Sequence, residues 1–151
     1  MNKKLCLLIS SGLGVGYSPL FPGTLASLVI LIPIWFIKEN FNLNVFISLI
    51  IFLIIISIYI ISNVIEEMEN KDPKFIVLDE YIGQAAALIF CRQDILDYIL
   101  AFIGFRILDI LKPFPINYID KIKNAYGVVF DDLLAGILIS LLFFFHYEIL
   151  I

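Results

Sequence analysis

Long apolar runs separated by short polar segments dominate the pattern of this chain, and they predict a bundle of helices. The clearest run is Val45–Ile61, which has 17 residues and only Ser48, Ser57 and Tyr59 as polar interruptions. A helix needs about 20 apolar residues to cross a bilayer, so this run is the strongest spanning candidate. Its many β-branched residues suit a strand, but the run is far too long for one.

Four further segments are predicted to form apolar helices. The first covers about residues 25–37, with Pro33 as a kink. Helices over 80–90 and 95–111 are short for a full crossing, so we expect them to be tilted, half-embedded or tucked inside the bundle. The last helix is expected to begin at Asp131 and to end near Phe145.

The polar segments between these runs are expected to be loops. Residues 10–24 are rich in Gly, Pro and Ser, 66–74 are the most polar stretch, and 112–127 follow the fourth helix. The apolar stretch Leu5–Ile9 is too short for the core of a secretory signal, and we expect it to remain uncleaved.

Composition favours a membrane protein. The chain of 151 residues predicts a single domain, 1–151, and it is 62% hydrophobic, compared with about 45–50% in soluble domains. We therefore expect an all-α fold, a compact polytopic membrane helical bundle with about four to five apolar helices, some short. The alternative is an unusually apolar soluble helical domain. Basic residues are scattered, which gives no indication of a nucleic-acid partner.

The basic residues also indicate an orientation. If the N-terminus is cytoplasmic and each of the five apolar segments crosses once, eight lysines and arginines lie inside and two outside, as the positive-inside rule expects. The inside residues are Lys3, Lys4, Lys71, Lys74, Arg106, Lys112, Lys121 and Lys123, and the outside residues are Lys38 and Arg92. The same topology places the acidic clusters on the cytoplasmic face, which predicts a shared site there.

Acidic residues at the edges of apolar runs are the first candidates for function. Asp79–Glu80 and Asp131–Asp132 each stand at the predicted start of a helix. Charges in apolar surroundings are costly unless they are paired or hold a metal. Helix capping is the alternative for either pair. It explains Gly83 and Gly136 less well, because glycine is unfavourable in a helix unless a backbone or ligand approaches closely.

A third group suits phosphate chemistry. Arg106, Asp109 and Lys112 share one stripe of a helix, where an intrahelical ion pair and a helix-terminal lysine are the structural alternative. Carboxylates suit Mg²⁺, and arginine and lysine bind phosphate oxygens. Pro22-Gly23-Thr24 precedes a predicted helix, where it forms either a phosphate-binding helix start or an ordinary cap.

Taken in order, four stretches resemble the phosphatidylglycerophosphatase A family. They are SPLFPGTLASL at 18–28, IVLDEYIGQ at 76–84, FRILDILKPFPINYID at 105–120 and YGVVFDDLLAG at 126–136. The patterns FR-x-x-D-x-x-KP-x-P and DD-x-x-AG are specific, and the match leaves out only the variable run around 38–70. One departure is NAYGVVF at 124–130, where the family is usually richer in glycine. This departure weakens the case for a backbone contact with phosphate there.

The resemblance implies a phosphoric monoester hydrolase that uses Mg²⁺ to remove the terminal phosphate of phosphatidylglycerophosphate. It also implies a helical fold in the bacterial inner (cytoplasmic) membrane, multi-pass, with the active site facing the cytoplasm. The oligomeric state stays open. Candidate catalytic residues and metal ligands carried over from the family are Asp79, Glu80, Asp109, Asp131 and Asp132. Candidate substrate-binding residues are Arg106 and Lys112, with Thr24 and Asp120 as weaker members.

Two mechanisms and one rival function remain open at this point. Phosphate can leave by attack of an activated water or through an aspartyl-phosphate. The rival is a small membrane transporter or channel subunit that uses the acidic residues as cation or proton sites. That function predicts carboxylates distributed through the depth of the membrane, whereas the charge-based topology gathers them on one side.

Overall fold

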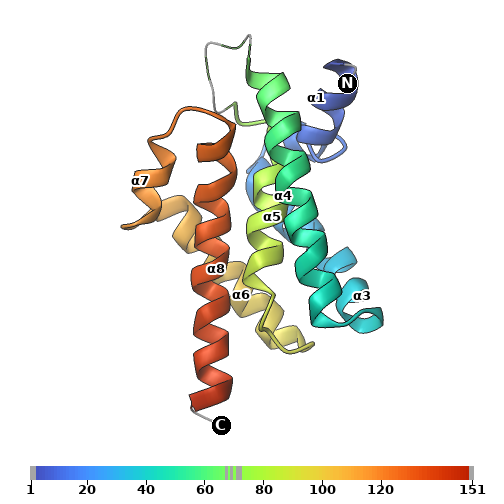
Figure 1. Cartoon of the computed structure of the whole chain (residues 1–151), viewed down its shortest axis with the longest axis vertical. Helices are drawn as coiled ribbons and strands as arrows, with labels where there is room; N and C mark the ends of the chain where they lie inside the picture. Colours follow the sequence, from blue (N-terminus) through green and yellow to red (C-terminus); the bar gives the residue numbers. More distant parts are fainter. Residues whose placement is uncertain (1–2, 67, 69, 71–72, 150–151) are drawn as a thin grey trace.

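Two long helices, α4 (Leu43–Ile65) and α8 (Ala125–Ile149), run along the length of the molecule on either side of the shorter α5 (Leu78–Ala87) (Figure 1). The computed structural model describes residues 3–66, 68, 70 and 73–149, and within these ranges it contains helices and no strand. The predicted all-α bundle is therefore confirmed. The other helices are α1 (Lys3–Ser10), α2 (Pro22–Val29), α3 (Leu31–Asn40), α6 (Ile95–Leu111) and α7 (Ile116–Asp120), with a 3₁₀ turn at Val15–Tyr17.

Helix α5 forms the buried centre of the bundle, and it packs most extensively against α8. Eight of its ten residues are buried, including Gly83 and three consecutive alanines. A Cβ atom placed on Gly136 would lie 2.1 Å from the carbonyl oxygen of Gly83, so the two backbones are almost in contact. The predicted close approach at both glycines is therefore a backbone contact. It brings the acidic residues of α5 and α8 to the same place.

Among the residues that the structure describes, three segments are long and apolar enough to cross a membrane, judged by length and composition. They are Pro22–Asn40, which combines α2 and α3, Leu43–Ile65 in α4, and Ala125–Glu148 in α8, with mean hydropathies of 1.4, 3.0 and 2.3. Helices α5 and α6 have 10 and 17 residues. Both are short for a crossing, as the sequence predicted.

The predicted helix over 25–37 is divided in two. Helix α2 ends at Val29 and α3 begins at Leu31, so the break precedes Pro33 instead of lying at it. Proline has no amide hydrogen for the carbonyl four residues earlier, and its ring clashes with that carbonyl. For Pro33 that residue is Val29, where α2 ends. The predicted kink is therefore real, and it appears one turn upstream.

The expectation that Asp131–Asp132 opens the last helix is wrong. Helix α8 begins at Ala125, and the side chain of Asn124 accepts hydrogen bonds from the amides of Tyr126 and Gly127. Asparagine is a favoured N-cap, so it starts the helix inside the predicted loop. The same loop, 112–127, also contains α7. Four residues of the polar stretch 66–74, Glu67, Glu69, Lys71 and Asp72, lie outside the described residues.

Side chains also connect the helices at the end of α5 far from its acidic residues. Lys38 of α3 donates hydrogen bonds to the carbonyl oxygens of Leu88 at 2.5 Å and Cys91 at 2.7 Å, just beyond the C-terminus of α5. Asp97 accepts a hydrogen bond from the Tyr147 hydroxyl and another from the Arg92 amide. These contacts satisfy carbonyl groups that a helix end leaves unpaired, and they attach the end of α8 to the bundle.

Candidate active site

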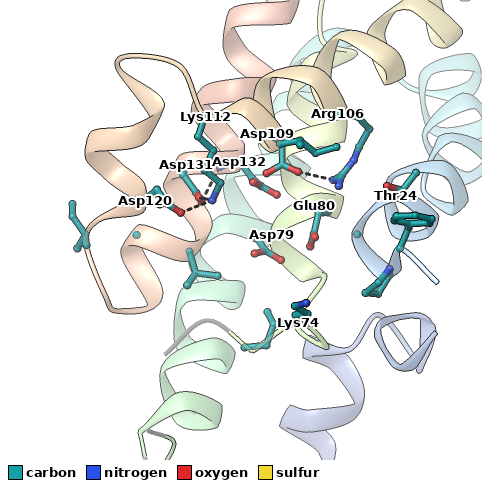
Figure 2. A pocket seen from close by; sticks show the side chains of 18 of the residues that line it. Thr24, Lys74, Asp79, Glu80, Arg106, Asp109, Lys112, Asp120, Asp131 and Asp132 are labelled. Carbon is teal, nitrogen blue, oxygen red and sulfur yellow. Dashed lines mark hydrogen bonds and ion pairs between the residues drawn. The ribbon is translucent and has the colours of Figure 1, made fainter. Parts of the chain in front are cut away.

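A cavity of about 510 Å³, lined by many charged side chains, lies between α2, α5, α6, α7 and α8 (Figure 2). All eight residues predicted from the sequence as catalytic, metal-binding or substrate-binding line it, as does the weaker candidate Asp120. They are Thr24, Asp79, Glu80, Arg106, Asp109, Lys112, Asp131 and Asp132. These residues come from α2, α5, α6 and α8, and Lys112 directly follows the last residue of α6. The predicted convergence is therefore present in the structure.

Three of the carboxylates form a compact group. Asp79, Glu80 and Asp132 each place an oxygen within 4.8 Å of the others. Asp79 and Asp132 are buried, and Asp79 Oδ1 and Glu80 Oε2 have no hydrogen-bond partner among the described residues. Asp79 and Glu80 lie in the first turn of α5, whose N-cap residue, Val77, makes no side-chain capping hydrogen bond. Neither acidic residue is the N-cap, and their unpartnered buried oxygens suit a hard divalent cation.

The remaining carboxylates are paired with cations. Arg106 Nη1 lies 2.7 Å from Asp109 Oδ2, which is the intrahelical pair expected from their spacing. Lys112 does not interact along its own helix. Its ammonium lies 2.5 Å from Asp120 of α7 and 2.5 Å from Asp131 of α8. Figure 2 shows Lys112 with its two carboxylates on one side of the cavity and the Arg106–Asp109 pair on the other, with Asp132 between them and Asp79 and Glu80 below in this view.

The surroundings of Lys112 keep it charged. Burial alone would lower the pKa of its ammonium group, but the hydrogen bonds to Asp120 and Asp131 outweigh burial and raise the pKa above the usual lysine value. The same contact with Lys112 holds the pKa of the Asp120 carboxyl below its usual range. The cavity therefore keeps a permanent positive charge near its acidic group.

The start of α2 is shaped to accept Glu80. A Cβ atom on Gly23 would lie 2.2 Å from Glu80 Oε1, so glycine is needed there for the carboxylate to fit. Helix α2 begins at Pro22, and no side chain caps it. Thr24 lines the cavity in this first turn. The first turn of α2 therefore packs directly against the acidic group.

Sequence reasoning missed three residues of the site. Ser27 is fully buried, donates to the Gly23 carbonyl at 2.9 Å and accepts from Arg106 Nη1 at 3.4 Å. Lys74 and Lys123 line the cavity. A signal was present for each. Ser27 lies one turn after Thr24 in the stretch SPLFPGTLASL, and the two lysines lie within five residues of an acidic candidate. Neither lysine belongs to one of the four stretches that resemble the family.

Fold and site together define a class. This is a helical protein with membrane-length apolar helices and an acidic, cation-lined pocket suited to a metal ion and a phosphate. A sequence model of the phosphatidylglycerophosphatase A family matches residues 8–147. The chain therefore belongs to the phosphatidylglycerophosphatase A family, as its motifs indicated, and its predicted enzyme class, phosphoric monoester hydrolase, is confirmed.

Individual relatives agree with this membership. Phosphatidylglycerophosphatase A of Escherichia coli is 31% identical over 140 residues, which cover 91% of this chain and 81% of the relative. The protein of the same name from Haemophilus influenzae is 33% identical over 142 residues, 89% of this chain and 87% of the relative. A Bacteroides thetaiotaomicron protein, provisionally named phosphatidylinositol-3-phosphatase, is 32% identical over 139 residues, 88% of this chain and 87% of the relative. No solved structure matches the chain.

Proposed function

We propose that this protein hydrolyses the terminal phosphomonoester of phosphatidylglycerophosphate, giving phosphatidylglycerol and phosphate, with Mg²⁺ as cofactor. One observation supports this proposal above the others: three clustered carboxylates from α5 and α8 and two cations from the end of α6 line a single cavity. The names of the family and of two relatives supply the lipid. We further propose that the cavity faces the cytoplasm in a bacterial inner membrane, as the distribution of basic residues predicts.

The donor set of the acidic group fits Mg²⁺. Asp79, Glu80 and Asp132 offer only oxygen atoms, and two of these oxygens have no partner among the described side chains and backbone groups. Mg²⁺ usually takes one or two carboxylates, several waters and phosphate oxygens. When bound, it would supply positive charge that offsets the charge of the phosphate during transfer. Ligand roles for Asp109 and Asp131 stay predictions, since both are paired with cations here.

Other residues would hold the phosphate. Arg106 presents a planar fork of donors, and Asp109 fixes the orientation of that fork through the 2.7 Å ion pair. Lys112, held between Asp120 and Asp131, provides a second positive charge. In the hydrolysis, the oxygen of a water molecule bonds to phosphorus and the bond between phosphorus and the glycerol oxygen breaks. The water gives up one proton, and the glycerol oxygen takes up one proton to become the hydroxyl of phosphatidylglycerol. Preorganised cations stabilise the charge on the equatorial phosphate oxygens.

The direct test is phosphate release by the purified protein in detergent. The substrates are phosphatidylglycerophosphate, phosphatidic acid and phosphatidylinositol 3-phosphate, each with Mg²⁺ and with EDTA. We expect the fastest release from phosphatidylglycerophosphate, loss of activity in EDTA and recovery with excess Mg²⁺. Faster release from another lipid would contradict the proposed substrate. Activity that persists in EDTA would contradict the proposed cofactor.

Replacement of Arg106 by lysine tests the phosphate-binding role. Lysine keeps the positive charge but loses the fork that contacts two oxygens at once, so we expect kcat to fall about a hundredfold. The control is Ser27→Ala, which removes the 3.4 Å contact with Arg106 and the hydrogen bond to the Gly23 carbonyl but leaves the guanidinium in place, and it should cost at most about fivefold. Full activity in Arg106→Lys would show that Arg106 does not bind the transferred phosphate.

A further inference from the structure

Two stretches of the chain, each with one residue that lines the cavity, carry exposed apolar side chains. The first lip is formed by Leu13, Tyr17, Leu20 and Phe21, ahead of α2, and the second lip by Ile110, Leu111, Phe114 and Tyr118, from the end of α6 to α7. Each of these eight side chains is between 60% and 76% exposed. None lies in the three segments that are long enough to span a membrane. Apolar side chains gathered at this density on a surface normally contact a partner or a membrane.

One residue from each lip also lines the cavity. Phe21 lies at the start of α2, and Ile110 lies one turn beyond Arg106 on α6. Both are therefore in contact with the polar interior and with the outside of the protein. If the phosphate of an amphiphile lay inside the cavity, the apolar part of the molecule would contact these two side chains where it emerges from the cavity.

Each lip contains a residue with a strained backbone conformation. Phe21 has a φ of 46° and Lys112, inside the second lip, has a φ of 43°. Both are in the left-handed region, which is unfavourable for residues with bulky side chains and persists only where the surroundings enforce it. Lys112 is fixed there by its two carboxylate partners. The exposed position of the apolar residues beside it is thus tied to the geometry of the site.

We propose that the two lips lie within the bilayer and form a lateral entrance, through which a diacyl lipid places its phosphate in the cavity while its acyl chains pass between Phe21 and Ile110. This entrance rests on the proposed function, which supplies a lipid as substrate. Beyond that function, the entrance specifies the route by which the substrate reaches the cavity and the side chains that contact its acyl chains.

A bilayer fits these surfaces better than a second copy of the chain. The lips continue into exposed apolar residues on the outer faces of α2 and α6, such as Leu28 and Ile107, each 50% exposed. Helix α2 is itself the start of a membrane-length segment. Exposed Lys121 and Lys123 follow the second lip, where cations suit anionic lipid headgroups. A membrane covers apolar surface that continues around the molecule, whereas a protein partner covers one patch.

The first experiment compares two forms of phosphatidylglycerophosphate, one with long acyl chains in vesicles and one with six-carbon chains in solution. In the double variant Phe21→Asn/Ile110→Ser, we expect kcat/KM for the long-chain form to fall about tenfold or more relative to kcat/KM for the short-chain form. Asparagine tolerates the left-handed backbone, which protects the fold. The matched control is Phe36→Asn/Ile95→Ser, which changes side chains that are 59% and 70% exposed and lie outside the cavity.

An unchanged ratio in the double variant, or an equal change in the control, would overturn the entrance. No release from either substrate by the unmodified protein would instead contradict the proposed function.

A second experiment locates the lips relative to the bilayer and does not depend on enzymatic activity. The chain has one tryptophan, so Phe21→Trp in a Trp35→Phe background gives a single fluorophore in the first lip.

In vesicles with brominated acyl chains, this fluorophore should be quenched as strongly as that of Ile55→Trp, a 64% exposed position in α4. Quenching of the α4 position alone would overturn the proposal. If the position in the first lip were not quenched and the protein were a dimer in the same vesicles, the first lip would instead be assigned to contact with a second copy.

Discussion

Asp132→Asn is expected to reduce phosphate release from phosphatidylglycerophosphate by about a thousandfold, the largest effect of any single substitution in the cavity. The amide keeps the shape of the side chain but removes one of the three carboxylates that could hold a cation. A thousandfold loss corresponds to about 4 kcal/mol of transition-state stabilisation. The measurement is kcat/KM with saturating Mg²⁺ in detergent. Asp79→Asn should behave in the same way.

The fold should survive this change. Asp132 is 4% exposed and close to other carboxylates, so neutralising it relieves repulsion. Without Mg²⁺, the melting temperature should be unchanged or higher, whereas the rise in melting temperature that Mg²⁺ gives the unmodified protein should be reduced. The control is Asp97→Asn, a carboxylate that is 8% exposed and paired with Tyr147 at the far end of α6. It should retain activity and its response to Mg²⁺. Full activity in Asp132→Asn would contradict the metal site.

Much of the helical architecture was predictable, because long apolar runs and local stop signals determine it. Helix α6 has the predicted bounds, 95–111, since Asp94 caps its start and prolines follow its end. The boundaries that failed depended on weaker local signals. Asn124 began α8 earlier than the acidic pair suggested, and α7 formed inside a segment that reads as loop.

The residues of the site were predictable, but their pairing was not. Charge distribution and family motifs identified most of the charged residues that line the cavity, because charged side chains in apolar surroundings are costly unless they have a function or a partner. Spacing along the helix placed Lys112 with Arg106 and Asp109, yet its ammonium contacts α7 and α8. That partnership depends on how three helices pack, which no local pattern encodes. The division into a cluster of three carboxylates, Asp79, Glu80 and Asp132, and two cation-paired carboxylates, Asp109 and Asp131, is therefore a product of the tertiary structure.

Gly136→Ala is expected to destabilise the protein and impair its site together. The added Cβ atom would lie 2.1 Å from the carbonyl oxygen of Gly83 and 2.9 Å from Ala86 Cβ, so α5 and α8 must separate. Overpacking of this kind costs about 3 kcal/mol, and we expect the melting temperature in detergent to fall by about 6–12 °C. Because Asp79 and Glu80 lie on α5 and Asp132 on α8, a small separation should also lower kcat about a hundredfold.

Gly104→Ala provides the matched control. Its Cβ atom would lie 2.8 Å from Ile139 Cδ1, the far end of a flexible side chain that can move aside. Alanine also favours a helix over glycine by about 1 kcal/mol, so this variant should be as stable as the unmodified protein or more stable. If both variants behaved alike, the backbone contact between α5 and α8 would not be what brings the acidic residues together. If the melting temperature and kcat fall only in Gly136→Ala, the geometry of the acidic group depends on the contact between α5 and α8 at this position.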